Sequence, residues 1–184
     1  MGRALARAAS VDASVYARIA ATETPRLDAA MLGLSRAADH GKLWFGTAAA
    51  FSISGGPRER RAAREGIRAL ALASAFTNLI GKPSTRRVRP VQIELGVHER
   101  RRGRMPGSSS FPSGHAASAF AFACGAGGAD PSVCLPLLAL ACAVGYSRVH
   151  TGVHYPADVI AGAAIGLAAA RFTSSTARRA RSAA

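Results

Sequence analysis

The sequence predicts an all-α integral membrane protein, a helix bundle with about five transmembrane helices and six as the alternative. Two observations carry this prediction. Five segments are apolar and nearly uncharged, and the arginines and lysines are concentrated in the joins between them. The segments also carry small residues on all sides, as in AGAAIGLAAA, so they lack the polar face of a soluble surface helix.

The N-terminal region precedes the first apolar segment. Residues 1–26 are expected to form a partly flexible segment, and because charged residues such as Arg7 and Asp12 interrupt it, no cleaved signal peptide is predicted. The following stretch, LDAAMLGLSRAADHGKLW, carries apolar residues at helical spacing with polar residues between them. It predicts an amphipathic helix on the membrane interface before the first span.

The five predicted spans are residues 43–56, 67–81, 114–128, 133–146 and 159–170. Each is shorter than the roughly 20 residues that cross a bilayer comfortably, so length alone also allows a soluble bundle. Flanking residues such as Lys42 and Arg68 are expected to extend the spans by snorkelling. Residues 27–172 would form one membrane-embedded domain, and residues 173–184 a disordered basic tail.

The net charge of +14, from 24 Lys+Arg and 10 Asp+Glu, predicts an anionic partner. The arginines punctuate apolar segments and do not form a stripe interleaved with aromatic residues, so nucleic-acid binding is not expected. Cys124, Cys134 and Cys142 lie in apolar runs without metal-ligand spacing and are interpreted as small hydrophobic residues.

The joins between five spans alternate between the two sides of the membrane. Residues 82–112 and 148–156 fall on one side, and residues 57–64 and the C-terminal tail fall on the other. Three polar clusters therefore meet on the first side. The basic residues near the spans are similar in number on the two sides, so the positive-inside rule leaves the side of these clusters open.

The first polar cluster is KPSTRRVRP, residues 82–90. It crowds Lys82 and Arg89 together with two more arginines and no acid, which is unfavourable unless an anion or a lipid headgroup compensates. For Arg86 and Arg87, a juxtamembrane basic patch is an equally good interpretation.

The second cluster is FPSGHAASAF, residues 111–120. Ser113 suits the N-cap of an apolar helix that begins at Gly114. The exposed N–H groups and the positive dipole end of such a helix favour an anion, and glycine lets the backbone approach it closely. His115 would add a proton donor or acceptor that works near neutral pH.

The third cluster is SRVHTGVHYPAD, residues 147–158. Pro156 suits the first turn of the last helix, which places His154 just before that helix and Asp158 inside its first turn. Asp158 would then accept the Nδ1–H of His154 and fix its tautomer. An alternative takes His150, His154 and Asp158 as zinc or iron ligands on one helical face. Gly152 and Pro156 argue against a continuous helix there, and nearby cations weaken the binding of a divalent metal.

These clusters resemble, in order, the motifs Kx6RP, PSGH and SRx5HxxxD of the type 2 phosphatidic acid phosphatase superfamily. The resemblance covers residues 82–158, less than half of the chain. It implies a multi-pass enzyme of the bacterial plasma membrane that hydrolyses a lipid phosphate without a metal or other cofactor. Its implied partners are the lipid substrate and the bilayer.

The resemblance also implies a role for each motif residue. His154 would attack phosphorus to form a phosphohistidine, Asp158 would orient it, and His115 would protonate the leaving alcohol. Five residues would hold the phosphoryl oxygens: Lys82, Arg89, Ser113, Gly114 and Arg148. His98 and His150 fall outside the pattern, and His150 is interpreted as a positioning or solvent-facing residue.

Superfamily membership indicates the reaction type better than the substrate. The compact chain, with LSRAADHGKLW before GGPRERRAA, is similar to small actinobacterial members linked to arabinan precursor synthesis for the cell wall. That similarity implies dephosphorylation of decaprenylphosphoryl-5-phosphoribose to decaprenylphosphoryl ribose. Polyprenyl diphosphate, phosphatidylglycerophosphate and phosphatidic acid stay open as substrates.

A non-catalytic lipid-binding membrane protein is the alternative of another class. It would explain the spans and the charge, but it would not require His115, His154 and Asp158 together. The oligomeric state stays open, because the small-residue face in AGAAIG suits helix packing within a chain or between chains.

Overall fold

The computed structural model describes residues 2–92 and 96–182, with side chains for residues 7, 9–92 and 96–176. The described chain folds into seven α-helices, which confirms the all-α prediction. Their bounds are α1 Gly2–Ala21, α2 Pro25–Ala37, α3 Lys42–Ser54, α4 Pro57–Phe76, α5 Gly114–Ala129, α6 Cys134–His150 and α7 Pro156–Ser182. Four short turns of 3-10 or π geometry complete the order: η1 Asp39–Gly41, η2 Thr77–Gly81, η3 Glu99–Arg101 and η4 Pro131–Val133.

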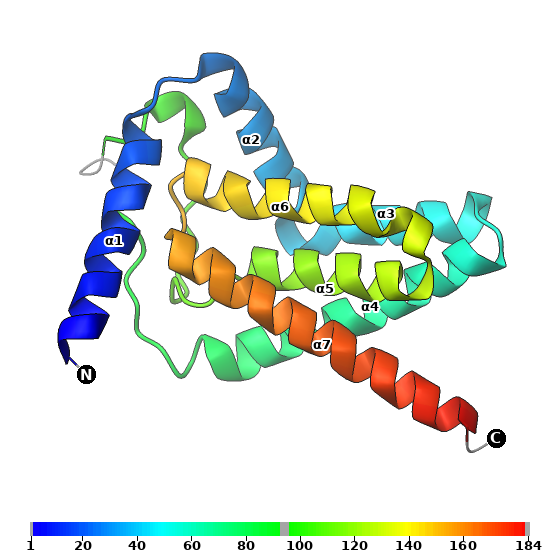
Figure 1. Ribbon diagram of the computed structural model, residues 1–184. Helices are drawn as coiled ribbons and strands as arrows, with labels where there is room; N and C mark the ends of the chain where they lie inside the picture. Colours follow the sequence, from blue (N-terminus) through cyan, green and yellow to red (C-terminus); the bar gives the residue numbers. More distant parts are fainter. Residues whose placement is uncertain (1, 93–95, 183–184) are drawn as a thin grey trace.

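Helix α5 forms the centre of the bundle and packs against α4, α6 and α7 (Figure 1). Small residues allow this close packing. A Cβ at Gly125 would lie 2.7 Å from the carbonyl oxygen of Glu65 in α4, and a Cβ at Gly166 in α7 would lie 2.5 Å from that of Ala117. The small-residue face of α7 therefore packs within the chain, against α5.

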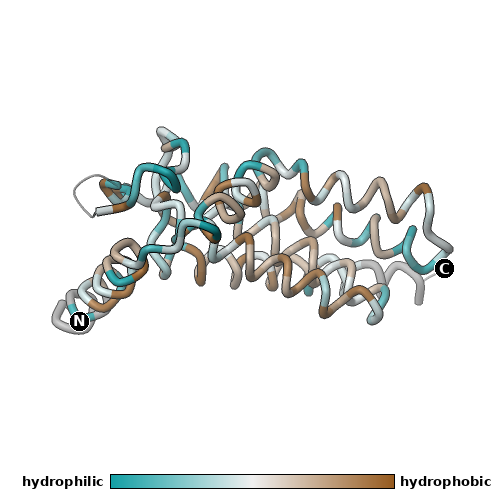
Figure 2. The backbone as a smooth tube through the Cα atoms, turned by 90° about the horizontal axis from the view of Figure 1, so that it is seen from above, coloured by the Kyte–Doolittle hydropathy of each residue, from teal (hydrophilic) through white to brown (hydrophobic). Residues whose placement is uncertain are grey.

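The outer surface of the bundle is apolar. Ile53, Leu135 and Ile160 belong to different helices, and each is at least 70% exposed. Figure 2 shows hydrophobic residues along the bundle helices and hydrophilic residues mainly toward its ends. Within the described part of the chain, two segments, Pro131–His150 and Pro156–Thr176, are long and apolar enough to cross a membrane. The remaining three spans stay a prediction.

Three helix ends lie beyond the predicted limits. Helix α4 begins at Pro57, so residues 57–64, predicted as a join, form its first turns. Helix α6 continues to His150, one turn past the predicted span. Helix α7 continues to Ser182, so the tail predicted to be disordered is helical as far as that residue. Alanine and arginine, which are frequent in the added turns of α4 and α7, are strong helix formers, whereas the prediction followed hydropathy alone.

Helices α1 and α2 cover one end of the bundle. Helix α1 lies near the ends of α6 and α7 (Figure 1), and its buried Tyr16 packs in a cluster with Val97 and Val149. The predicted amphipathic helix is present as α2. Its polar residues Asp28 and Ser35 are buried against the protein, while Leu27 is exposed.

Candidate active site

The three polar clusters meet at the end of the bundle that α1 and α2 cover. The backbone N–H of Ser113 donates to the carbonyl oxygen of Asp158 at 2.9 Å. Arg89 Nη1 lies 3.1 Å from His154 Nε2. Lys82 Nζ lies beside α5, 3.6 Å from the point that a Cβ on Gly114 would occupy. The predicted site residues therefore come from three segments that are distant in sequence and adjacent in space.

His154 lies in the join between α6 and α7, where its backbone N–H donates to the carbonyl oxygen of Arg148 at 3.1 Å. Its ring is buried, with Nδ1 at 3.4 Å from Asp158 Oδ2 and Nε2 facing Arg89. A guanidinium only donates hydrogen bonds, so Nε2 is the acceptor and Nδ1 carries the proton. Burial lowers the pKa of His154 to about 4, so the ring is neutral at pH 7. The lone pair of His154 Nε2 therefore points toward Arg89.

Asp158 is fully buried in the first turn of α7, as predicted. Its Oδ2 accepts a hydrogen bond from the Tyr155 N–H at 2.9 Å and another from the Ser110 hydroxyl. Its Oδ1 accepts from Arg87 Nη1 at 2.7 Å. These bonds fix the carboxylate with Oδ2 directed at His154.

Arg87 connects Asp158 to helix α1. Its Nη2 donates to Asp12 Oδ2, and its guanidinium lies 4.6 Å from the centre of the Tyr155 ring. Asp12 Oδ1 in turn accepts the backbone N–H of Ala157 at 2.8 Å, so α1 supplies a carboxylate to the N-terminus of α7. Arg87 therefore forms an internal ion pair, and the basic-patch interpretation is wrong for this residue.

The cations of the site are held by neutral and acidic oxygens. Arg89 donates to the carbonyl oxygens of Val153 at 2.8 Å and Ser108 at 3.0 Å. Lys82 Nζ donates to Asn78 Oδ1 at 3.1 Å. Burial lowers the pKa of Lys82, and the nearby arginines lower it further.

Arg148 is buried in the last turn of α6. Its Nη1 donates to the Ser35 hydroxyl of α2 and lies 3.8 Å from Asp39 Oδ1. Its Nε has no hydrogen-bond partner among the described residues. A buried cationic N–H without a partner is costly and favours an anion.

The N-terminus of α5 lies among these cations. Ser113 is its N-cap, as predicted, and its hydroxyl accepts the Ala116 N–H at 3.4 Å. His115, in the first turn, lies with Nε2 at 2.8 Å from Asp39 Oδ1. Asp39 follows α2 and therefore brings the N-terminal region to the site.

His150 is buried, which contradicts the solvent-facing interpretation. Its Nε2 lies 2.8 Å from Asp28 Oδ1 in α2, and Arg101 Nη1 lies 3.6 Å from the same oxygen. This group fastens α2 to the last turn of α6. His150 is thus a structural residue beside the site.

The alternative metal site is not formed. Helix α6 ends at His150 and α7 begins at Pro156, so His150, His154 and Asp158 do not share one helical face. Gly152, with a φ of 75°, makes the turn between them. Across the residues that the structure describes, no group of three or more His, Cys, Asp or Glu side chains is arranged to hold a metal ion.

Comparison with known proteins identifies the family. The model of the PAP2 superfamily matches residues 67–182, which include all three polar clusters and more than half of the chain. The chain belongs to the PAP2 superfamily. It is accordingly a PAP2 phosphatase, a metal-independent phosphomonoesterase that acts on a membrane lipid phosphate.

Individual relatives agree with this assignment. The decaprenylphosphoryl-5-phosphoribose phosphatase of Mycobacterium tuberculosis is 35% identical over 156 residues, 83% of this chain and 81% of the relative. LpxE of Aquifex aeolicus superposes with a TM-score of 0.69 at 23% identity, over 87% of this chain and 92% of that structure. A transmembrane PAP2-type phosphatidylglycerolphosphate phosphatase from Bacillus subtilis gives 0.72 at 20% identity, over 94% and 87%. This PAP2 phosphatase therefore shares the fold of these solved structures.

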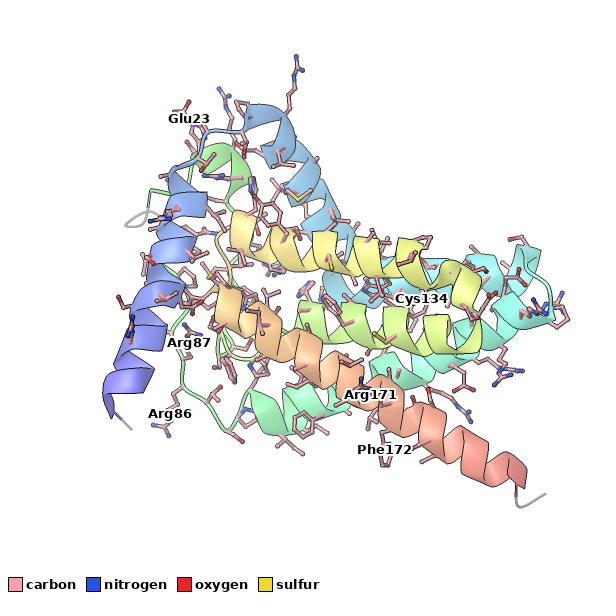
Figure 3. All side chains as sticks on the ribbon, viewed as in Figure 1. Glu23, Arg86, Arg87, Cys134, Arg171 and Phe172 are labelled. Atoms are coloured by element: carbon pink, nitrogen blue, oxygen red, sulfur yellow. The ribbon has the colours of Figure 1, made fainter. Side chains whose placement is uncertain are left out.

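The Arg87 ion pairs are expected to contribute strongly to stability. Arg87→Ala leaves the carboxylates of Asp12 and Asp158 buried without their cation, at a cost of about 3 kcal/mol. This corresponds to a fall in the thermal midpoint of about 6–12 °C, measured in detergent. The matched control is Arg86→Ala, because Arg86 is exposed and lies outside the bundle (Figure 3). Equal midpoints for the two variants would contradict this assignment.

Proposed function

We propose that this PAP2 phosphatase hydrolyses its lipid phosphate through a phosphohistidine on His154. The supporting observation is the geometry of that ring. Asp158 faces Nδ1, and the Nε2 lone pair faces Arg89. A neutral imidazole held in this tautomer is a ready nucleophile, and the low pKa of His154 keeps it neutral at pH 7.

Three cations and one helix terminus would hold the phosphoryl group. Lys82, Arg89 and Arg148 supply positive charge, and the Nε of Arg148 offers a buried N–H. The N-terminus of α5, with Ser113 and Gly114, adds backbone donors and the positive end of a helix dipole. Phosphoryl transfer is accelerated by such neutralisation of the equatorial oxygens.

The reaction then has two steps. In the first, the P–N bond to His154 forms, the P–O bond to the lipid alcohol breaks, and His115 gives its proton to the leaving oxygen. In the second, His115 takes a proton from water, the water oxygen attacks phosphorus, and the P–N bond breaks to release phosphate. Asp39, which lies 2.8 Å from His115 Nε2, would hold the ring of this acid and base in place.

The proposed setting is the bacterial plasma membrane, with α3 to α7 as five spans. Two of these segments have the length and hydropathy of a span. The exposed Ile53 of α3 and Leu79 of η2 extend the apolar surface over two more. The phosphatase domain would comprise residues 27–172, with α1 attached to its active-site end through Asp12.

The proposed substrate is decaprenylphosphoryl-5-phosphoribose, which the enzyme would convert to decaprenylphosphoryl ribose. The support is the extent of the similarity to the mycobacterial phosphatase, which covers more than four fifths of each chain. Polyprenyl diphosphate, phosphatidylglycerophosphate and phosphatidic acid are the competing substrates.

Phosphate release from a panel of these four lipids tests the proposal. The purified enzyme in detergent with EDTA is expected to give its highest kcat/KM on the phosphoribosyl lipid. Activity on any of the lipids excludes a purely lipid-binding role. A higher kcat/KM on another lipid would overturn the proposed substrate, and a loss of activity in EDTA would contradict the metal-free steps above.

A further inference from the structure

A cavity of about 560 Å³ adjoins the proposed catalytic residues, between the start of α3 and the facing sides of α4 and α5. Lys82, Gly114 and His115 are among the residues that line it. His154 is not among the described residues that line it. Because phosphoryl transfer places the nucleophile and the leaving group on opposite sides of phosphorus, a cavity on the side of His115 suits the leaving group.

One wall of the cavity is polar. Ser74 of α4, Asn78 of η2 and Lys82, which directly follows η2, are spaced at intervals of four residues, and Ser118 of α5 also lines the cavity. The hydroxyl oxygens of Ser74 and Ser118 lie 3.1 Å apart. Asn78 Oδ1 accepts from Lys82, and its Nδ2 donates to the Ser74 carbonyl oxygen at 3.0 Å. The result is a row of donors and acceptors leading away from the phosphate site.

Apart from His40, the rest of the lining is apolar or glycine. Ile67 and Leu70 of α4 lie in the lining, and Phe45 of α3, which is 51% exposed, stands at the outer surface. A ligand that fits both walls carries polar groups next to its phosphate and a hydrocarbon chain beyond them. A phosphate attached directly to a hydrocarbon chain would place apolar groups against this polar row, whose side chains would then keep only the hydrogen bonds that they make within the protein.

We infer that this cavity binds a hydroxyl-bearing leaving group, a sugar that joins the reacting phosphate to a long lipid. Ser74 and Ser118 hydrogen-bond its hydroxyl groups, and the wall of Ile67, Leu70 and Phe45 receives the adjoining part of the lipid. This inference rests on the proposed function, because it assigns the leaving-group side to His115. It makes the two serines the residues that select a sugar phosphate over a simple alkyl phosphate.

The test compares two substrates in the full-length enzyme in detergent: decaprenylphosphoryl-5-phosphoribose and farnesyl monophosphate, which has no sugar. The variants are Ser74→Ala, Ser118→Ala and the double substitution. Each lost hydrogen bond is expected to lower kcat/KM on the ribose lipid by about tenfold, and both together by up to about 100-fold. Turnover of farnesyl monophosphate is expected to stay close to that of the wild type.

Ser52→Ala is the matched control, because Ser52 is also a helical serine, bonded to the Ala48 carbonyl oxygen, and it lies outside this cavity's lining. It is expected to leave both rates unchanged. Equal losses on both substrates in the serine variants would overturn the inference while leaving the proposed function standing. A wild-type enzyme that does not hydrolyse the ribose lipid would overturn both. Retained preference for the ribose lipid in the double variant would overturn the inference alone.

Discussion

His154→Ala is expected to lower kcat by at least about 10⁴-fold while leaving substrate binding measurable. The variant removes the nitrogen that would form the bond to phosphorus, and the loss of a nucleophile typically costs this much or more. Lys82 and Arg148, which are proposed to hold the phosphate, stay in place, so the lipid is expected to bind still. Initial rates of phosphate release and a direct binding measurement in the same detergent give the two quantities.

His98→Ala is the control for this variant, because His98 is an exposed histidine in the loop before α5. It is expected to retain wild-type rates. A His154→Ala protein that folds, as judged by its thermal midpoint, and turns over at the wild-type rate would show that His154 is not the nucleophile.

Asp158→Asn is expected to lower kcat by about 10³–10⁴-fold with a smaller change in KM. The asparagine has a similar shape, but it removes the negative charge beside His154 Nδ1 and so removes control of the tautomer. The same substitution in a serine protease triad costs about this much. Steady-state kinetics on the best lipid of the panel provide the measurement.

Arg87→Ala separates this effect from a loss of structure. It removes the arginine of the Arg87–Asp158 ion pair but leaves the carboxylate of Asp158 facing His154. Its main effect is therefore expected on stability, with a loss of kcat well below that of Asp158→Asn. Equal losses of kcat in the two variants would mean that the ion pair, not the orientation of the nucleophile, controls the rate.

The three motif clusters could be predicted from the sequence because each places several charged, histidine or helix-capping residues within about ten positions of the chain. Pro156 located the start of α7, and this placed His154 before the helix and Asp158 within it, as the structure confirms. Ser113 was likewise predicted to be the N-cap of α5, and the structure places it there. Alternation of the joins then predicted that the clusters meet, since helical spans return the chain to the same side.

The partners from the N-terminal helices could not be predicted. Asp12, Asp28 and Asp39 contact residues 73 to 145 positions away, and one acid in an amphipathic helix has the same sequence pattern as a solvent-facing residue. One signal was present in the composition. The cationic cluster of residues 82–90 contains no acid, so its counter-charges come from an anion, from a lipid headgroup or from acidic residues elsewhere in the chain. Which helix supplies them depends on tertiary packing.

The ends of the helices were missed for a different reason. Hydropathy indicates which side chains contact lipid or the protein core. A helix ends where the backbone leaves helical φ and ψ angles, and this can happen beyond the apolar segment. The arginine-rich first turns of α4 and the last turns of α7 are polar and still helical. For the same reason Arg148 and His150, predicted to lie in a join, complete the last turn of α6.

Trapping the covalent intermediate tests the central claim most directly. The enzyme is mixed with substrate labelled in the reacting phosphate, quenched in alkali within its first turnover, and digested for mass spectrometry. The phosphoramidate of a phosphohistidine survives alkali and is lost in acid, and the account predicts this label on His154, with none on the His154→Ala protein. Label on another residue, or an active enzyme that carries no label throughout its first turnover, would contradict the account.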